Sequence, residues 1–279
     1  MPVKLIALDL DGTLLDSRSQ ISEDNVLTIA EAAARGVEIV IVTGRRFDFA
    51  RPVVEALPCD LHLIVSNGAL IKTKSGETHQ RLLLPAAVAR RALGATPEYR
   101  ALAAVVFDHT REGQIVMERV DWDDPVRGRY LRRNREYIAE VIPLENCLNG
   151  EDPIQVMFTG PCATMREAKR ALEVSVAASD FTLALAEYEA RDFSILDVLR
   201  RGVTKGVALA EWAMRRGIAR ENVMAVGDNW NDREMLEFAG VPVVMGNGVS
   251  ELKTFGWPVT LANDQSGVAA AIRRYALDE

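Results

Sequence analysis

The sequence lacks long apolar segments, paired cysteines and an excess of positive charge, and each absence excludes a class of protein. No apolar run reaches the roughly 18 residues of a membrane span, and no signal-peptide pattern opens the chain. The three cysteines are scattered and form no C-x-x-C pair, which argues against zinc sites and disulfide frameworks. With 33 basic and 40 acidic residues, the net charge of −7 argues against a nucleic-acid surface. We therefore expect a cytoplasmic monomer or homodimer with no membrane or nucleic-acid partner.

The first feature that the sequence does contain is a pair of carboxylates at the end of an apolar run. The run begins at Val3 and stops at Asp9 and Asp11. Residues i and i+2 of a strand share a face, so both carboxylates converge where ligands bind in open α/β sheets. Their repulsion favours a bound cation, and oxygen ligands beside a phosphate favour Mg²⁺. Alone, such a pair is more often an acidic turn; a calcium loop fits poorly, because Thr13 stands where a third ligand is needed.

The N-terminal third repeats a strand–turn–helix pattern. Ser22 is expected to cap the first helix, and Gly36 to end it. The apolar run Val37–Val42 predicts a buried parallel strand, a helix follows from about Phe47 to Leu57, and Leu61–Val65 is the next strand. This rhythm predicts a doubly wound parallel sheet.

The rhythm changes near residue 84, where strands begin to follow strands. This part predicts an α+β arrangement with helices at 85–94 and 162–178 and strands at 101–108, 114–120, 154–159 and 181–186. The alternation returns from about residue 191, with a strand at 193–198, a helix at 205–217 and a strand at 222–226. We therefore predict an α/β protein with a core domain of residues 1–83 and 191–279 and an inserted α+β cap domain of residues 84–190.

Four predicted strand ends of the core domain carry polar side chains, which are Asp9 with Asp11, Thr43-Gly44, Lys205, and the run Gly227–Asp232. Singly, each has a simple explanation, such as a helix start, a solvated lysine or a capped turn. Parallel strands bring their carboxyl ends to one edge of the sheet, however, so these groups can meet in space. All four groups occur in this order, each after a predicted strand, and this makes a chance combination of four unrelated features a poor explanation.

These segments resemble a known family. DLDGTLLDS, VTGR, GVTKG and GDNWND resemble the four motifs of the haloacid dehalogenase-like phosphatases, as do AGVPVVMGN and NDQSGVAAAI near the end. The insert, placed between the threonine and lysine motifs, resembles the α/β cap of the Cof-type subgroup. The resemblance covers the core domain by its motifs and the cap only by position and rough pattern. It implies a Rossmann-like core and an Mg²⁺-dependent phosphatase.

The resemblance also implies residue roles. Asp9 would be the nucleophile that becomes an aspartyl phosphate, and Asp11 the general acid and then the general base. The phosphoryl group would be held by Thr43, Gly44, Arg45, Lys205 and Asn231. Mg²⁺ would be bound by Asp9, a backbone carbonyl of Asp11 and Asp228, while Asp232 would reach the ion through water or orient Lys205.

Three functional hypotheses remain open at this stage. The leading one is a phosphatase acting on a small phosphorylated metabolite, such as a sugar phosphate, sugar-acid phosphate or cofactor phosphate. A phosphomutase or other phosphotransferase acting on a sugar phosphate fits the same motifs. A binding protein with an idle site fits poorly, because the motif residues are intact. A dinucleotide-binding enzyme is disfavoured, since no G-x-G-x-x-G follows the first strand.

Substrate choice is expected to depend on the insert, which would close over the site. The segment Arg127–Arg135 contains five arginines, which form either a solvated helix face or a contact for a second anionic group. Trp230, between presumed site residues, is either packed in the core or a wall of the substrate entrance. Asn67 is a candidate for supporting the site loops.

Overall fold

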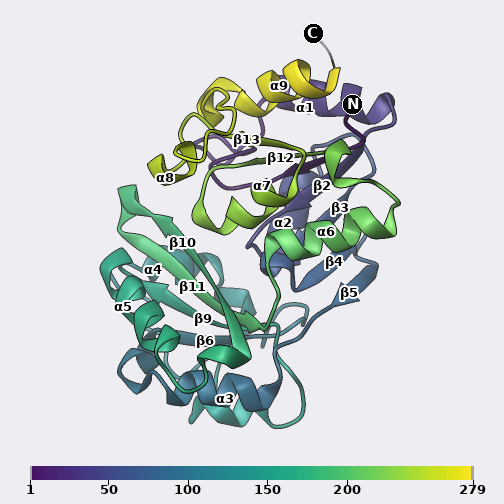
Figure 1. Ribbon diagram of the computed structural model, residues 1–279. Coiled ribbons are helices and arrows are strands. Elements are labelled where there is room, and N and C mark those ends of the chain that lie inside the picture. Colours follow the sequence, from purple (N-terminus) through teal and green to yellow (C-terminus); the bar gives the residue numbers. More distant parts are fainter. Residues whose placement is uncertain (1, 278–279) are drawn as a thin grey trace. The chain divides into compact units, whose positions relative to one another are not determined.

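The computed structural model describes residues 2–277, which form two compact units (Figure 1). The first unit combines the chain up to Arg81 with the chain from Thr204 onward, and the second unit is the intervening Leu82–Val203. Within the described residues, no helix has both the length and the apolar character needed to cross a membrane.

A seven-stranded sheet forms the centre of the first unit, in the order β13-β12-β1-β2-β3-β4-β5. Its strands are β1 (Leu5–Leu8), β2 (Glu38–Val42), β3 (His62–Val65), β4 (Leu70–Thr73), β5 (Thr78–Arg81), β12 (Val223–Gly227) and β13 (Val241–Val244). All neighbouring pairs from β13 to β3 are parallel, as the sequence predicted. The β4–β5 hairpin adds two antiparallel strands at one edge. It was not predicted, because its short strands carry polar residues that suggest a loop.

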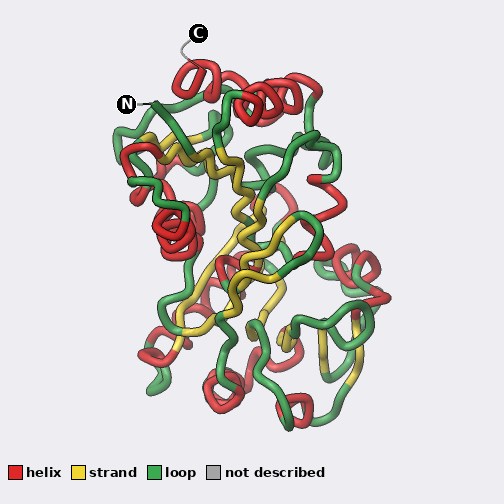
Figure 2. Tube along the Cα trace, turned by 90° about the vertical axis from the view of Figure 1, so that its right-hand side faces the viewer, coloured by secondary structure: helices red, strands yellow, loops and turns green. Residues whose placement is uncertain are grey.

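Helices cover both faces of this sheet, as the trace in Figure 2 shows. They are α1 (Glu23–Ala34), α2 (Phe47–Val54), α6 (Lys205–Arg215), α7 (Arg233–Phe238), α8 (Ser250–Lys253) and α9 (Gly267–Ile272). On one face, apolar side chains of β1, β2 and β3 pack against Leu209 and Trp212 of α6 and Leu236 of α7. Ser22 caps α1 as expected, accepting a hydrogen bond from the backbone N–H of Asn25. The fold is therefore a doubly wound α/β domain.

The second unit contains a mixed six-stranded sheet in the order β10-β11-β9-β6-β7-β8. Its strands are β6 (Ala103–Val106), β7 (Ile115–Met117), β8 (Ile138–Glu140), β9 (Gln155–Gly160), β10 (Phe181–Tyr188) and β11 (Phe193–Arg200). The helices are α3 (Ala86–Gly94), α4 (Gly128–Arg133) and α5 (Cys162–Glu173). Val156 and Phe158 of β9 pack with Leu93 of α3 and Leu172 of α5 in one core. The predicted α+β character of the insert is therefore observed.

The strand β11 corrects the predicted end of the insert. The sequence pattern predicts residues 191–203 in the core domain, but β11 pairs antiparallel with both β10 and β9. Its register runs from Phe193 opposite Tyr188 to Arg200 opposite Phe181, across a tight turn in which Asp192 has a φ of 43°. An apolar strand has the same local pattern in either sheet, so its partner could not be predicted from sequence. The first unit resumes at Thr204, not near residue 191.

Candidate active site

Three adjacent strands bring the predicted site residues to one edge of the first sheet. β1 lies between β12 and β2, with Leu8 opposite both Val226 and Ile41. Asp9 follows β1 directly, Thr43 follows β2 and Asp228 follows β12. Because the three strands are parallel and in register, these residues leave the sheet side by side.

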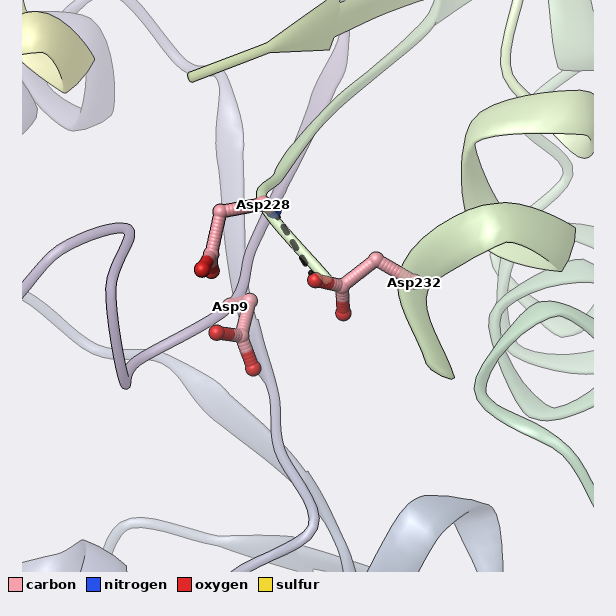
Figure 3. Close-up of side chains that lie close together, drawn as sticks. All are labelled: Asp9, Asp228 and Asp232. Atoms are coloured by element: carbon pink, nitrogen blue, oxygen red, sulfur yellow. Dashed lines mark hydrogen bonds between the residues drawn. The ribbon is translucent and has the colours of Figure 1, made fainter. Parts of the chain in front are cut away.

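The carboxylates of Asp9, Asp228 and Asp232 converge at this edge (Figure 3). One oxygen of each lies within 4.8 Å of the others, and the residues are only 4%, 8% and 0% exposed. Asp232 is held in place by the loop itself, because its Oδ2 accepts hydrogen bonds from the backbone N–H groups of Asp228 and Asn229, each at 3.0 Å. The loop after β12 therefore fixes the carboxylate of Asp232, beside which lie Asp228 of the same loop and Asp9 from the end of β1.

Lys205 is inserted into this group from the first turn of α6. Its Nζ lies 2.7 Å from Asp9 Oδ1 and 2.6 Å from Asp232 Oδ1, and the residue is 2% exposed. Burial by itself would lower the pKa of Lys205, but attraction to Asp232 and Asp9 outweighs it and raises the pKa. The side chain of Thr204 caps α6 by accepting from the N–H of Val207, which fixes where the helix and its lysine begin.

The cluster brings three carboxyl groups together with one ammonium group. Burial, followed by repulsion from Asp232, raises the pKa of Asp9 to about 7, and the attraction of Lys205 only partly opposes this. Burial and the Asp9 charge likewise raise the pKa of Asp228. An additional cation would relieve this repulsion. Three converging carboxylates form the oxygen-rich donor set that hard divalent cations such as Mg²⁺ prefer, so these residues fit such an ion.

The Asp228 carboxylate is positioned by two residues whose role the sequence analysis missed. Thr13 donates from its hydroxyl to Asp228 Oδ1 at 2.8 Å. Gly12 has a φ of +85°, and a Cβ built on it would lie 2.3 Å from Asp228 Oδ2. Only glycine combines this backbone conformation with this close approach. The D-x-D-G-T pattern contains both residues, but their partner Asp228 lies more than 200 residues away in the sequence, so their role could not be predicted.

Asp11 lies outside the three-carboxylate group and is bound to Arg45. The Arg45 guanidinium donates from Nε to Asp11 Oδ2 at 2.7 Å and from Nη2 to Oδ1 at 2.5 Å. The backbone N–H of Arg45 donates to the Thr43 hydroxyl at 3.1 Å. This pairing joins the Asp motif to the Thr motif, and no local feature of the sequence predicts it.

Asn231 and Gly44 meet at Asn67. The Nδ2 of Asn231 donates to Asn67 Oδ1 at 3.2 Å, and a Cβ on Gly44 would lie 3.1 Å from that same oxygen. Trp230 is 38% exposed, so it is not a core residue. The first unit thus contains all the predicted site residues, which are Asp9, Asp11, Thr43, Gly44, Arg45, Lys205, Asp228, Asn231 and Asp232.

The arginine-rich segment lies in the second unit, and part of it is fastened there. Arg127 is buried and donates to Asp124 Oδ2 and to the carbonyl of Ala101, both at 2.9 Å. Arg132 donates to the carbonyl of Trp122 at 2.5 Å, and the Arg135 guanidinium lies 5.0 Å from the centre of the Trp122 ring. These contacts favour a structural role for these three arginines.

Comparison with known proteins gives the class of this chain. The sequence profile of the haloacid dehalogenase-like hydrolases matches residues 6–272, and the chain therefore belongs to that family. It is similar to a putative phosphatase, M6_Spy0533 of Streptococcus pyogenes, at 30% identity over the full length of both chains. It also resembles the pyridoxal phosphate phosphatase YbhA of Escherichia coli, at 27% identity over 91% of each chain.

Solved structures agree with this assignment. A haloacid dehalogenase-like hydrolase from B. subtilis superimposes with a TM-score of 0.82 and 26% identity, covering 97% of this chain and 99% of the other. The subclass IIB sugar phosphatase BT4131 shares the fold, with a TM-score of 0.80 and 22% identity over 99% of this chain and 100% of that one. The chain is thus a hydrolase of this family, with relatives named as phosphatases and a Rossmann-like core interrupted by an inserted unit.

Proposed function

We propose that this chain is an Mg²⁺-dependent phosphatase that hydrolyses a small phosphorylated metabolite through an aspartyl phosphate on Asp9. The observation that carries the proposal is the buried Lys205 ammonium between Asp9 and Asp232, with Asp228 beside them. Relatives named for pyridoxal phosphate and for 5-amino-6-(5-phospho-D-ribitylamino)uracil support a phosphorylated cofactor or cofactor precursor as substrate. These two molecules share a phosphate ester and little else.

In the first half-reaction, a carboxylate oxygen of Asp9 attacks phosphorus as the bond to the ester oxygen breaks. Asp11 gives a proton to the departing oxygen, and Lys205 offsets negative charge on the Asp9 carboxylate and the phosphoryl group. In the second half-reaction, Asp11 takes a proton from a water molecule that attacks the acyl phosphate. Inorganic phosphate leaves and Asp9 is regenerated.

The remaining residues bind and orient the phosphoryl group. The Thr43 hydroxyl, the Gly44 N–H and the Asn231 amide would donate hydrogen bonds to its oxygens, while Arg45 holds the Asp11 carboxylate in place. Mg²⁺ would be held by Asp9, Asp228 and the Asp11 carbonyl, with Asp232 contributing through water, and when bound it would neutralise phosphoryl charge.

We propose that the second unit acts as the cap that contacts the leaving group. Its insertion between the segments of Thr43 and Lys205 supports this role, and its boundaries become residues 82–203 instead of the 84–190 expected from sequence. Enclosure of the site would exclude water other than the attacking molecule.

The test is phosphate release from an aryl phosphate and from a panel of phosphorylated metabolites, with Mg²⁺ and with a chelator. The Asp9→Asn variant keeps the side-chain shape and removes the nucleophile, so we expect a loss of at least about 10³-fold. Circular dichroism would confirm that the variant is folded. Undiminished release by Asp9→Asn would overturn the nucleophile assignment, and an isomerised sugar phosphate without free phosphate would reveal a phosphomutase instead.

A further inference from the structure

The turn Ser66–Gly68, between β3 and β4, has an unusual backbone. Its three residues have φ values of 50°, 54° and 105°, and two of them carry side chains. Left-handed backbone is costly for residues other than glycine, and asparagine tolerates it better than most. All three residues are buried. Such strain persists only where surrounding contacts enforce it, and it concentrates at functional sites.

The backbone of this turn is tied to the Thr43–Arg45 segment. The N–H of Asn67 donates to the carbonyl of Thr43 at 3.1 Å, and the N–H of Ser66 donates to the carbonyl of Arg45 at 2.9 Å. These bonds fix the turn to the segment that carries the hydroxyl and backbone N–H groups assigned above to phosphate binding.

The same turn lies against the start of α6. A Cβ on Gly68 would approach the Thr204 carbonyl to 2.5 Å, so the two backbones are in direct contact. Thr204 is the N-cap residue that precedes Lys205. The turn therefore touches two of the four segments that supply site residues, and the side chain of Asn67 reaches a third, which contains Asn231.

The side chain of Asn67 lies between Gly44 and Asn231. Its Oδ1 accepts from Asn231 Nδ2 at 3.2 Å, and the hypothetical Cβ of Gly44 would lie 3.3 Å from its Nδ2. A side-chain amide nitrogen carries two hydrogens. Bonding one of them to Asn67 fixes the plane of the Asn231 amide and directs the second hydrogen, which can be offered to a phosphoryl oxygen.

We propose that Asn67 is a positioning residue, which aligns the Asn231 amide with the Thr43-Gly44 turn so that both bind the same phosphoryl group. The inference rests on the proposed function. Asparagine suits this position because it combines tolerance of left-handed backbone with an acceptor at the length needed to reach Asn231. A loosened Asn231 would bind phosphate in several orientations, and small misplacements of such groups cost up to about 100-fold in rate.

The variant Asn67→Gly tests the side chain alone, because glycine keeps the left-handed backbone and its hydrogen bonds. We expect kcat/KM for an aryl phosphate with Mg²⁺ to fall about 10- to 100-fold, with a higher KM for the ester. The melting temperature should move by less than about 3 °C. The matched control is Ser19→Gly, at an exposed turn residue with a φ of 62°, which should leave both quantities unchanged.

A double-mutant cycle with Asn231→Ala separates positioning from a general loss of structure. If Asn67 acts through Asn231, the double variant should lose little more activity than Asn231→Ala alone. Losses that multiply, or an Asn67→Gly enzyme with wild-type kcat and KM, would overturn the inference.

Calorimetric titration with inorganic phosphate and Mg²⁺ distinguishes this inference from the proposed function. A wild-type chain that cleaves no ester would refute the proposed function, and the affinities for phosphate would then decide the role of Asn67. We expect Asn67→Gly to bind phosphate at least about 10-fold more weakly than the wild type, by the same loss of alignment. Equal affinities, or no phosphate binding by the wild type, would overturn the role of Asn67.

Discussion

Asp9, Asp228 and Asp232 are costly to bury together, and the ammonium group of Lys205 is bonded to two of them, Asp9 and Asp232. Burial and mutual repulsion raise the pKa of Asp9 and of Asp228. The charged carboxylates therefore lower the stability of the folded chain compared with uncharged side chains at the same positions. Sites that trade stability for charge in this way are usually functional.

Gly12 offers a sharp test of this arrangement, because Gly36 is a matched control. Both have nearly the same φ, +85° and +84°, but only a Cβ on Gly12 collides with Asp228, while one on Gly36 has no neighbour within 4 Å. Each change to alanine should cost about 1 kcal/mol of backbone strain. We expect Gly12→Ala to lose phosphatase activity and Mg²⁺-dependent stabilisation as well, and Gly36→Ala to retain both. Equal activity of the two variants would refute the positioning of Asp228 by Gly12.

Lys205 gives the second prediction at this scale. Lys205→Met leaves Asp9 and Asp232 buried without their shared ammonium, so the unfolding free energy should drop by about 3–5 kcal/mol and activity should be lost. Adding Asp232→Asn removes one of the uncompensated charges. The double variant should recover stability in denaturant titrations without recovering activity. If its stability does not recover, buried charge is not the cause of the loss.

At the scale of elements, the limits of sequence reasoning follow from locality. The β1–α1–β2 pattern and the end of β1 at Asp9 were predictable, because periodicity and capping are local signals. The hairpin of β4 with β5 was not predictable, because its short strands carry polar residues that are also typical of a loop. The sheet that β11 joins was not predictable either, because its partner β9 lies on the far side of α5 in the chain. Separation along the chain likewise hid the contacts of Thr13 with Asp228 and of Arg45 with Asp11.

Arg100 connects three segments of the second unit, and its ion pairs make the stability of the chain depend on pH. It donates to Glu118, after β7, at 2.9 Å, and to Glu145 at 2.5 Å. A hydrogen bond from the Leu144 N–H, together with Arg100, lowers the pKa of Glu118 below its usual 4.5, and Arg100 lowers the pKa of Glu145. Because both values are lower in the folded state, the stabilisation is present above pH 4.5 and is lost as pH falls through the folded pKa values.

Arg100→Met should therefore destabilise the chain at neutral pH by about 1–3 kcal/mol. The difference from wild type should hold above pH 4.5 and shrink as pH falls below it, because protonated glutamates no longer need the arginine. Arg91→Met is the control, since Arg91 and Asp180 form an exposed pair that should contribute less than about 1 kcal/mol. Calorimetric unfolding across this pH range measures both, and a pH-independent difference for Arg100→Met would contradict the linkage.

At the scale of the whole molecule, every residue assigned to the chemistry comes from the first unit, while the second unit interrupts its sequence. The strand order explains how three of the four segments meet, since β12 and β2 lie on either side of β1 in the sheet, and the fourth segment, with Lys205, comes from the start of α6. The sequence motifs predicted that the site residues meet at the carboxyl ends of the parallel strands. The residues that hold each carboxylate are visible only in the folded chain.

The effect of Mg²⁺ on the stability and hydrogen exchange of the full chain tests whether the ion binds in the first unit. Mg²⁺ at 100 times its dissociation constant should stabilise the protein by about 2.7 kcal/mol. Hydrogen exchange should slow in the loops after β1 and β12, which contain Asp9 and Asp228, and stay unchanged in the core strands of residues 82–203. Asp228→Asn removes one repelling charge, so we expect it to be more stable than the wild type without Mg²⁺ and to lose the response to the ion. An Mg²⁺ response that persists in this variant, or one confined to residues 82–203, would place the ion elsewhere.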